Sequence, residues 1–488
     1  MKKIVVLLLG IMIFSASGVF ASGLAIPEQG AAAMGMSAAV TARSEDLSAI
    51  FYNPAGIDYV ENFEIMLGIT PIRPGHEYHP FREDFELGLF KGIDAESQTF
   101  LPPQIYAAWR TNEKMVLGLG VYAPFGLGTD WDKKWDGRYV STFAEITNIH
   151  INPTLSYTVN DMVSVGVGFS YITSSATIEK MIDTGSALWN AMGRNPAMAS
   201  LAANKGYDSL FNLEGDGSAF NFNLGTIIRP FENLQLGVSY RSAFDIEYEG
   251  TAKFKHEETM IRNTVAGATT LALQGSGLND ATIAALASAQ ADTAYWGLSG
   301  MMPSTQDGTA TIHMPWTLNF GMKYDITDAW DTSLDLDFVG WSVYDKLVID
   351  FDKNKPKDKS TLKKDWENTF TLRGGTSYDI NEAFVARGGL MYDSNPVPDD
   401  TFDPQLPDSD RWGLSVGAGY KLGNIRIDAS YMLLQFLGRE KNNAVGFDTD
   451  VTGDGIVDRF DVPMGYPIGN GKYKSRAHLF SVSASYMF

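Results

Sequence analysis

The chain of 488 residues contains no cysteine, which excludes disulfides and thiolate chemistry. It carries only 38 Lys and Arg against 58 Asp and Glu, a formal net charge of -20. Such acidity argues against nucleic-acid binding, which needs a basic surface. Beyond the first 21 residues there is also no uncharged apolar run of the about 18 residues that a membrane-spanning helix requires.

The N-terminus has the pattern of a secretory signal peptide. Lys2 and Lys3 precede an apolar stretch at residues 4–14, and small residues flank a candidate cleavage site after Ala21. We therefore expect residues 1–21 to be a signal peptide and the mature chain to begin at Ser22. No cysteine follows the apolar stretch, which excludes lipoprotein processing.

The last ten residues alternate strictly between two kinds of side chain. One face carries Phe480, Val482, Ala484, Tyr486 and Phe488, and the other carries Ser481, Ser483 and Ser485. A period of two predicts a β-strand between two different environments. Lipid outside, a polar lumen inside and a terminal aromatic at the interface are typical of an outer-membrane barrel.

The same alternation recurs along the chain and predicts an all-β fold, a fourteen-stranded antiparallel transmembrane β-barrel over residues 61–488. The expected strands lie near 62–72, 99–110, 115–126, 144–158, 162–180, 218–229, 233–254, 308–325, 329–352, 364–379, 383–394, 410–421, 424–440 and 472–488. Short polar turns join many pairs, and long extracellular loops are expected at about 181–217, 255–307 and 441–471. Residues 187–210 and 278–298 in these loops have helical spacing.

Residues 22–60 do not alternate. They are small and rich in alanine, and they end in the segment Asn53-Pro54-Ala55-Gly56. We expect a compact N-terminal hatch, or plug, inside the lumen.

No arrangement of side chains predicts catalysis. The six histidines show no metal-ligand spacing on one strand face, except for His76 and His79 in a Pro-rich stretch. His150 and Ser156 would share the inner face of one strand, but six residues separate them, which is too far for a hydrogen bond. A hydrolase pair formed across strands is the weaker alternative, and we expect no catalytic residue and no required cofactor.

Alternation turns several charges toward the lumen. These are Arg241, Arg373, Arg387, Arg426, Asp335 and Asp337. Enclosed charges usually pair, so one interpretation is ion pairing that holds the wall together. The other is that Arg241, Arg373 or Arg387 stays available to bind a ligand carboxylate with its planar fork.

Residues 450–461 match the spacing of a calcium-binding loop. The candidate oxygen ligands are Asp450, Thr452, Asp454, Asp458 and Asp461. A glycine and an aliphatic residue also fall where such loops place them, but the last ligand is Asp rather than Glu, and no flanking helices are predicted. The alternatives are a structural calcium site and an acidic solvated hairpin loop.

Several segments resemble the long-chain fatty-acid and aromatic-hydrocarbon transporters of Gram-negative outer membranes (the FadL type). The likeness rests on the N-terminal segment with Asn53-Pro54-Ala55, and on residues 122–129, 240–242, 393–398 and 407–411. The resemblance implies a plugged fourteen-stranded barrel in which an apolar ligand is caught between outer loops, passes to a lumen pocket and leaves sideways through a kink in the third strand.

The resemblance also assigns roles to particular residues. Asn53, Pro54 and Ala55 match the hatch motif that lies against the kink, and Pro124, Phe125 and Gly126 match the kink itself. Pro124 lacks a ladder donor and Gly126 weakens a strand, so an interruption here is physically reasonable. A hatch under about forty residues in a barrel of fewer than 22 strands predicts passive transport.

The sequence thus favours passive uptake of hydrophobic compounds, most of all long-chain fatty acids. Uptake of aromatic hydrocarbons or other neutral lipids is the alternative within the class, and a structural or adhesive surface protein is the alternative from another class. The expected partners are the apolar ligand, outer-membrane lipid and lipopolysaccharide, and the barrel-assembly machinery. We expect a monomer that binds no nucleic acid.

Overall fold

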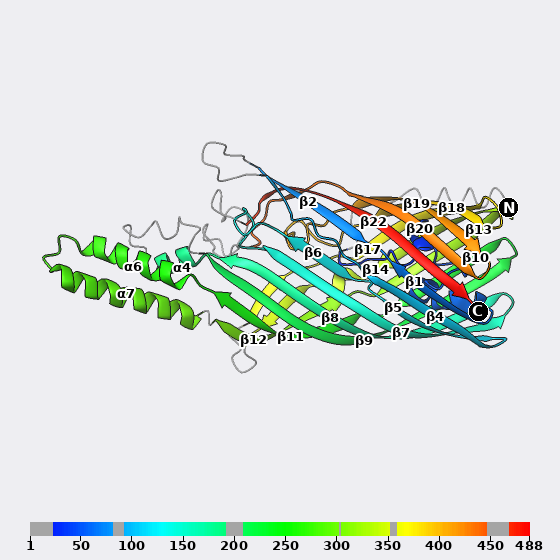
Figure 1. Cartoon of the computed structure of the whole chain (residues 1–488), viewed down its shortest axis with the longest axis horizontal. Coiled ribbons are helices and arrows are strands. Elements are labelled where there is room, and N and C mark those ends of the chain that lie inside the picture. Colours follow the sequence, from blue (N-terminus) through cyan, green and yellow to red (C-terminus); the bar gives the residue numbers. More distant parts are fainter. Residues whose placement is uncertain (1–22, 82–91, 192–207, 302–303, 352–358, 447–467) are drawn as a thin grey trace.

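The computed structural model describes residues 23–81, 92–191, 208–301, 304–351, 359–446 and 468–488. Most of these residues form one closed antiparallel β-barrel (Figure 1). We call each of its fourteen positions a wall strand; several consist of two labelled strands in succession. In chain order the wall strands are β1 (Phe63–Ile69) with β2 (Ile72–Pro80), β3 (Ile93–Asp94) with β4 (Pro103–Asn112), β5 (Met115–Tyr122) with β6 (Gly126–Asp130), β7 (Phe143–Asn160), β8 (Val163–Ile182), β9 (Ser209–Phe231), β10 (Leu234–Arg241) with β11 (Phe244–Lys255), β12 (Thr305–Met314) with β13 (Thr317–Thr327), β14 (Trp330–Val339) with β15 (Lys346–Asp350), β16 (Lys359–Lys363) with β17 (Thr369–Asp379), β18 (Phe384–Asp393), β19 (Arg411–Leu422), β20 (Ile425–Phe436) with β21 (Arg439–Lys441), and β22 (Gly471–Met487).

The predicted fourteen-stranded barrel is confirmed. The last strand closes on the first, with Glu64 opposite Met487 and Ile69 opposite Val482. Two predicted boundaries are wrong, because the first wall strand continues through β2 to Pro80, and β9 begins at Ser209, so residues 209–217 are wall rather than loop. Both extensions keep their ladder bonds to a neighbouring strand, and such pairing does not need lipid to persist.

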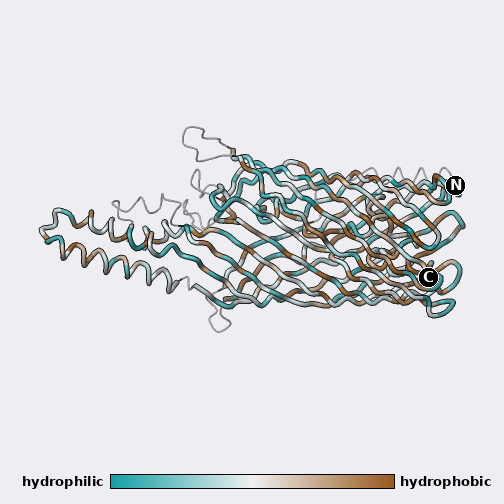
Figure 2. The backbone as a smooth tube through the Cα atoms, in the orientation of Figure 1, coloured by the Kyte–Doolittle hydropathy of each residue, from teal (hydrophilic) through white to brown (hydrophobic). Residues whose placement is uncertain are grey.

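Burial in the wall is the reverse of that in a soluble protein. On β22, Phe480 and Val482 are exposed, whereas Ser481 and Ser483 are buried. Figure 2 shows hydrophobic and hydrophilic residues alternating along the strands. The exposed apolar face is the one that lipid covers, so the alternation has the meaning that the sequence predicted.

Outside the barrel, two long helices form a hairpin that projects beyond one rim (Figure 1). They are α6 (Glu258–Leu273) and α7 (Asp280–Met301), with the shorter α4 (Thr184–Ala191) beside them. The predicted helix at 278–298 corresponds to α7. Of the predicted helix at 187–210, residues 187–191 belong to α4, residues 209 and 210 belong to β9, and residues 192–207 lie outside the described residues. The predicted 441–471 loop lies largely outside the described residues.

The α6 helix was not predicted. Its sequence contains four threonines and one glycine, residues of low helix propensity. The helix gains tertiary support instead, because Arg262 lies 4.5 Å from the ring centroid of Tyr295 on α7 and also pairs with Asp292. The hairpin lies at the rim opposite the C-terminus, and since long loops of such barrels lie outside the cell, this rim is the extracellular one.

Residues 23–60, which we call the N-terminal segment, fill the barrel. The segment contains α2 (Ala31–Met34), α3 (Ala49–Tyr52) and the 3₁₀ helix η1 (Pro54–Tyr59), and most of its residues are buried. Its hydrogen bonds reach several wall strands. Ser37 N donates to Ser415 Oγ of β19 at 2.8 Å, and Thr41 N donates to Asp335 Oδ2 of β14 at 2.7 Å. Asn53 Nδ2 donates to the Thr226 carbonyl of β9 at 3.1 Å, and Arg426 Nη1 of β20 donates to the Glu45 carbonyl at 2.8 Å. The polar inner faces of the strands are therefore matched by the polar groups of the segment.

Candidate functional site

The third wall strand is interrupted. β5 ends at Tyr122 and β6 begins at Gly126, while the neighbouring β7 runs past both without a break. Pro124 in the gap has no N–H to donate, which explains why the ladder stops there. Among the described residues, β6 forms a ladder only with β7; toward the second wall strand it is joined by the bond from the Glu96 amide to the Asp130 carbonyl at 2.8 Å, and the wall between Tyr122 and that bond has no ladder.

The N-terminal segment supplies the hydrogen bonds that the kink lacks. The amide of Ile26 donates to the Pro124 carbonyl at 2.7 Å, and the amide of Gly126 donates to the Leu24 carbonyl at 3.0 Å. The Gln29 side-chain amide donates to the Ala123 carbonyl at 3.1 Å. Backbone groups without partners are costly at membrane depth, so residues 24–29 act as a short substitute strand.

The Asn53-Pro54-Ala55 motif makes no hydrogen bond to Pro124, Phe125 or Gly126 among the described residues, although Pro54 lines the same cavity as Pro124 and Phe125; its role as a gate stays a prediction. The Asn53 side chain donates to the Thr41 carbonyl at 2.8 Å and accepts from Ala55 N at 3.2 Å, which caps η1. It packs on the uninterrupted strands β8 and β9. The resemblance implied that the motif lies against the kink. In the structure, the residues of the N-terminal segment that bond to the kink are Leu24, Ile26 and Gln29.

Glycines in that uninterrupted wall make room for the motif. A Cβ on Gly225 would lie 2.0 Å from Asn53 Oδ1, and a Cβ on Gly166 would lie 2.3 Å from Ala55 N. Any larger residue at either position would displace the segment. The alternating glycines of the predicted strands thus have a steric role here.

A cavity lies at the kink. Its lining is mostly apolar and comes from the N-terminal segment, the kink, β2, β7 and β22. It includes Ile146, which is buried, as well as Thr147, which lies on the outer face of the same strand, and Leu101, which is 58 % exposed. The cavity therefore extends through the wall at the level of the kink.

A second cavity lies in the lumen, between the N-terminal segment and β9, β10, β13, β14 and β17. Ala25 and Phe125 line both cavities and form an isolated β-bridge. Pro54 and Pro124 line the lumen cavity as well, so the motif and the kink meet at its surface without bonding to each other. Only a thin layer of residues separates the lumen from the opening in the wall.

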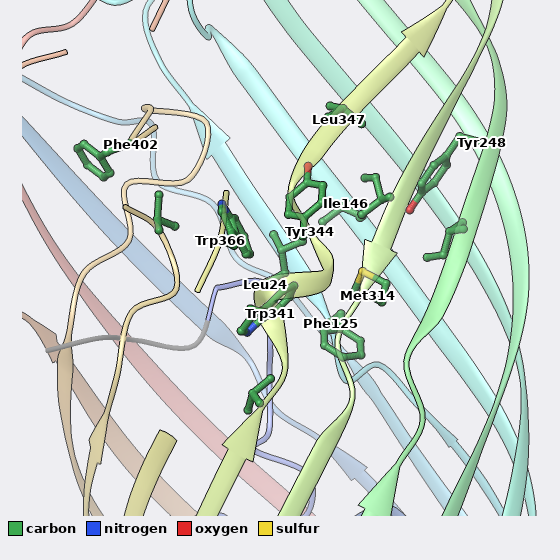
Figure 3. Packing of buried hydrophobic residues seen from close by; sticks show 14 of the residues in the cluster. Leu24, Phe125, Ile146, Tyr248, Met314, Trp341, Tyr344, Leu347, Trp366 and Phe402 are labelled. Atoms are coloured by element: carbon green, nitrogen blue, oxygen red, sulfur yellow. The ribbon is translucent and has the colours of Figure 1, made fainter. Parts of the chain in front are cut away.

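Apolar and aromatic side chains continue from these cavities toward the outer rim. Figure 3 shows Leu24, Phe125, Trp341 and Trp366 gathered in this cluster. The Trp341 and Trp366 ring centroids are 4.8 Å apart, and Phe125 lies edge-on to Trp341 at 6.3 Å. An apolar molecule that enters from outside would meet this cluster before it reaches the kink.

The three candidate arginines have different partners. Arg373 Nε lies 2.7 Å from Asp337, and Arg387 Nη1 lies 2.8 Å from Asp428. Both follow the ion-pairing interpretation, as does Arg426, whose Nε lies 2.7 Å from Asp428.

Arg241 has no carboxylate within 4.0 Å in the part of the chain that the structure describes. It is 5 % exposed and borders the lumen cavity. Its Nη2 donates to the Phe51 carbonyl at 2.9 Å, its Nη1 contacts the Tyr122 hydroxyl at 3.3 Å, and its guanidinium lies 5.1 Å from the Phe51 ring centroid. Of the three candidates, it is the one whose guanidinium contacts only neutral groups.

Two acids near the kink escaped sequence reasoning. Asp408, in the segment between β18 and β19, accepts the Gly23 amide at 2.9 Å. Burial raises the pKa of the Asp408 carboxyl to about 6, and the nearby Arg411 opposes that shift. Burial also raises the pKa of Glu28 in the N-terminal segment. The one signal in the sequence was that Asp408 lies within residues 407–411, a segment that carries the family resemblance.

Other predicted sites are placed as follows. Ser156 donates to the Ala55 carbonyl at 3.0 Å, and His150 packs against Tyr122, so the two form no pair. No cluster of three or more metal-binding acids or histidines occurs in the described ranges. The calcium-loop residues Asp450, Thr452, Asp454, Asp458 and Asp461, and the signal peptide at 1–21, lie outside the described residues. No described helix is long and apolar enough to cross a membrane.

Comparisons with known proteins agree with this architecture. A putative outer membrane protein of Neisseria meningitidis serogroup B is 25% identical over 504 residues, covering 100% of this chain and 98% of that protein. The long-chain fatty acid transport protein of Escherichia coli strain K12 is 22% identical over 346 residues, covering 68% of this chain and 70% of that protein.

Solved structures share the fold. A FadL homologue of Pseudomonas aeruginosa superposes with a TM-score of 0.73 at 20% identity, covering 96% of this chain and 100% of that one. The toluene transporter TodX of Pseudomonas putida superposes with a TM-score of 0.61 at 14% identity, covering 96% and 99%.

The family model described as outer membrane protein transport protein (OMPP1/FadL/TodX) matches residues 12–488. The fold, the outer-membrane location and transport of hydrophobic compounds follow from that match rather than from any single motif. The chain is a member of the OMPP1/FadL/TodX family of outer-membrane transport proteins.

Proposed function

We propose that this barrel takes up long-chain fatty acids passively and releases them sideways at the kinked wall strand. The observation that carries the proposal is Arg241, a buried guanidinium at the lumen cavity with no carboxylate partner in the described residues. A buried cation of this kind is costly unless a charged ligand completes its surroundings. A fatty-acid carboxylate supplies that charge, and its chain fits the apolar lining.

The route follows the apolar surfaces. The ligand passes the aromatic cluster at Trp341 and Trp366, binds at the lumen cavity and leaves through the cavity at the kink. Lateral exit suits an apolar ligand, because it avoids a second crossing of water. In this scheme residues 24–29 move away from Pro124 and Gly126, while Asn53, Pro54 and Ala55 hold the rest of the N-terminal segment.

Neutral cargo is the second candidate. The ring edges and faces around Phe125, Phe244 and Trp341 suit an aromatic hydrocarbon, and such a molecule needs no cation. The toluene transporter TodX shares the fold. Membership of a transport family speaks against the structural or adhesive alternative.

Binding of an acid and its matching alcohol separates the two cargo classes. With purified protein in detergent, Arg241→Gln should weaken oleate binding about ten- to a hundredfold. This factor corresponds to the loss of a charge-assisted hydrogen bond, which contributes roughly 1.5–3 kcal/mol. Oleyl alcohol should bind the variant and the parent equally.

The control variants are Arg373→Gln and Arg387→Gln, whose guanidinium groups already pair with carboxylates. Neither should change the ratio of acid to alcohol binding. If Arg241→Gln binds oleate as tightly as the parent does, the lumen does not recognise the carboxylate, and a neutral cargo becomes the better assignment.

A further inference from the structure

The outer face of the last strand changes character halfway along its length. From Phe480 toward the C-terminus the outward residues are apolar, whereas Lys472, Lys474 and Arg476 point outward nearer the extracellular rim and are exposed. The intervening residues, Tyr473 and Ser475 among them, face inward and are buried. Three cations thus stand one above another on the membrane-facing side of β22.

These cations lie just above the lipid-covered band. On β9, across the barrel, the outward apolar residues run from Ile228 to Phe220 and then give way to Ser218 and Asp216. On β22 the same change falls between Phe480 and His478, whose Nδ1 lies 2.9 Å from the Tyr431 hydroxyl. Tyrosine hydroxyls of this kind mark the interface between hydrocarbon and headgroups.

The neighbouring strand extends the cluster. Arg73 on β2 is exposed and stands opposite His478. We call Arg73, Lys472, Lys474 and Arg476 the basic column. Three acids lie around it: Glu77 stands opposite Lys474, Asp94 stands opposite Glu77, and Glu440 lies 3.2 Å from Lys472.

Most of the column is not neutralised by the protein. Among the described residues, no carboxylate lies within 4.0 Å of Arg73, Lys474 or Arg476. Four cations against three acids leave a positive surface in a chain whose formal net charge is -20. This surface is an exception that general solubility does not explain.

On the opposite wall, the residues beyond the apolar band have the reverse charge. The exposed outward residues there are Glu214 and Asp216 on β9 and Asp245, Glu247 and Glu249 on β11. The rim that faces the outer leaflet is therefore divided into a basic side and an acidic side.

We propose that the basic column binds the phosphorylated glucosamine headgroup of lipopolysaccharide in the outer leaflet. Its position at headgroup level brings the cations beside the phosphates, while Phe480 and Val482 below them contact acyl chains. Arg and Lys near an anionic membrane surface attract its phosphates, and Arg adds a fork of donors. Outward residues on a strand are about 6.6 Å apart, so Lys472 and Arg476 span about 13 Å and can reach two phosphates of one headgroup.

Retention of lipopolysaccharide by the purified barrel tests this site. The full-length protein is mixed with lipopolysaccharide micelles and separated by gel filtration, and the bound lipid is quantified by mass spectrometry. Lys474→Gln/Arg476→Gln should retain at least about tenfold less than the parent, given roughly 1 kcal/mol for each cation near an anionic surface. The matched control Lys253→Gln/Lys255→Gln removes two exposed cations from β11 on the acidic side and should retain as much as the parent.

Two further measurements identify the ligand. Dephosphorylated lipopolysaccharide should be retained poorly by the parent, and neither inorganic phosphate nor phosphatidylglycerol micelles at equal phosphate concentration should displace the bound lipid. Equal retention by the two double variants would overturn the site. Displacement by phosphate or phosphatidylglycerol would overturn the assignment to lipopolysaccharide. Heat-modifiable gel mobility shows that each variant is folded, and the Lys474→Gln single variant replaces the double variant if that fails.

Discussion

The N-terminal segment meets the barrel wall in two contrasting ways. At the kink, backbone groups of residues 24–26 bond to Pro124 and Gly126, and an apolar cavity lies directly behind them. At β8 and β9, by contrast, Asn53 and Ala55 fit against glycines with no space for a Cβ. Pro124 leaves the wall open at the kink, whereas Gly166 and Gly225 let the wall at β8 and β9 interlock with the N-terminal segment.

The difference indicates which part of the segment can move. The kink contact consists of a few hydrogen bonds whose partners become free as soon as residues 24–29 shift. The contact at β8 and β9 is steric as well as polar, so leaving it costs both hydrogen bonds and close packing. We expect motion at residues 24–29, with the remainder of the segment as a fixed base.

The largest effect is expected from restoring the ladder at the kink. Pro124→Val provides an N–H and a residue that favours strands, so the wall can close where it is now open. Lateral exit depends on backbone groups at the kink that lack ladder partners, so closing the ladder should reduce uptake of labelled oleate by at least about tenfold. A tenfold change in rate corresponds to about 1.4 kcal/mol in the barrier to exit.

Pro153→Val is the matched control, since Pro153 lies within the continuous strand β7, opposite Leu119 of β5, and away from the kink. This variant should take up oleate like the parent. Normal uptake in a folded Pro124→Val variant would show that the ligand does not leave through the kink.

A smaller effect is expected from filling the space at the interlocked wall. Gly225→Ala places a Cβ 2.0 Å from Asn53 Oδ1, where the atom cannot fit without moving the segment. Overpacking of this kind costs about 1–3 kcal/mol, so the temperature at which the barrel loses its compact gel mobility should fall. Gly374→Ala is the control, because a Cβ there meets nothing within 4 Å. Equal unfolding temperatures for the two variants would mean that the segment is not held at β9.

The smallest effect is expected from loosening only the part that moves. Gln29→Leu keeps the size of a buried side chain but removes its donor to the Ala123 carbonyl. The Gly126 amide, which bonds to Leu24, should then exchange with solvent about fivefold faster, as expected for the loss of about 1 kcal/mol. The Ala55 amide in the same sample is the internal reference and should be unchanged. Equal acceleration at both amides would indicate that the segment moves as one body.

Much of this architecture follows from local sequence pattern. Strict alternation and polar turns predict the strand number, because each strand faces lipid on one side and a filled lumen on the other. Pro124 also indicates where a ladder can stop, since proline has no N–H to donate, although Pro153 within the continuous strand β7 shows that proline alone does not break a strand.

Other features depend on contacts between distant residues. Alternation turns Arg241, Arg373 and Arg387 inward, but only the three-dimensional arrangement shows that Arg373 reaches Asp337 and that Arg241 lies among aromatic rings. The roles of Leu24 and Ile26 also cannot be predicted from the sequence, because these residues act through a backbone carbonyl and a backbone amide, groups that are not specific to a residue type. The α6 helix depends on its partner α7 and has little signal of its own.

The enclosure of the N-terminal segment also bears on the order of assembly. Ser37 bonds to Ser415, and Glu45 accepts from Arg426, so residues made early wait for partners made near the end of synthesis. Bringing such distant residues together carries a loop-closure cost that only the nearly complete sheet can offset. We therefore expect the first part of the chain to reach its final position among the last, as β22 joins β1 and the sheet curls shut around it.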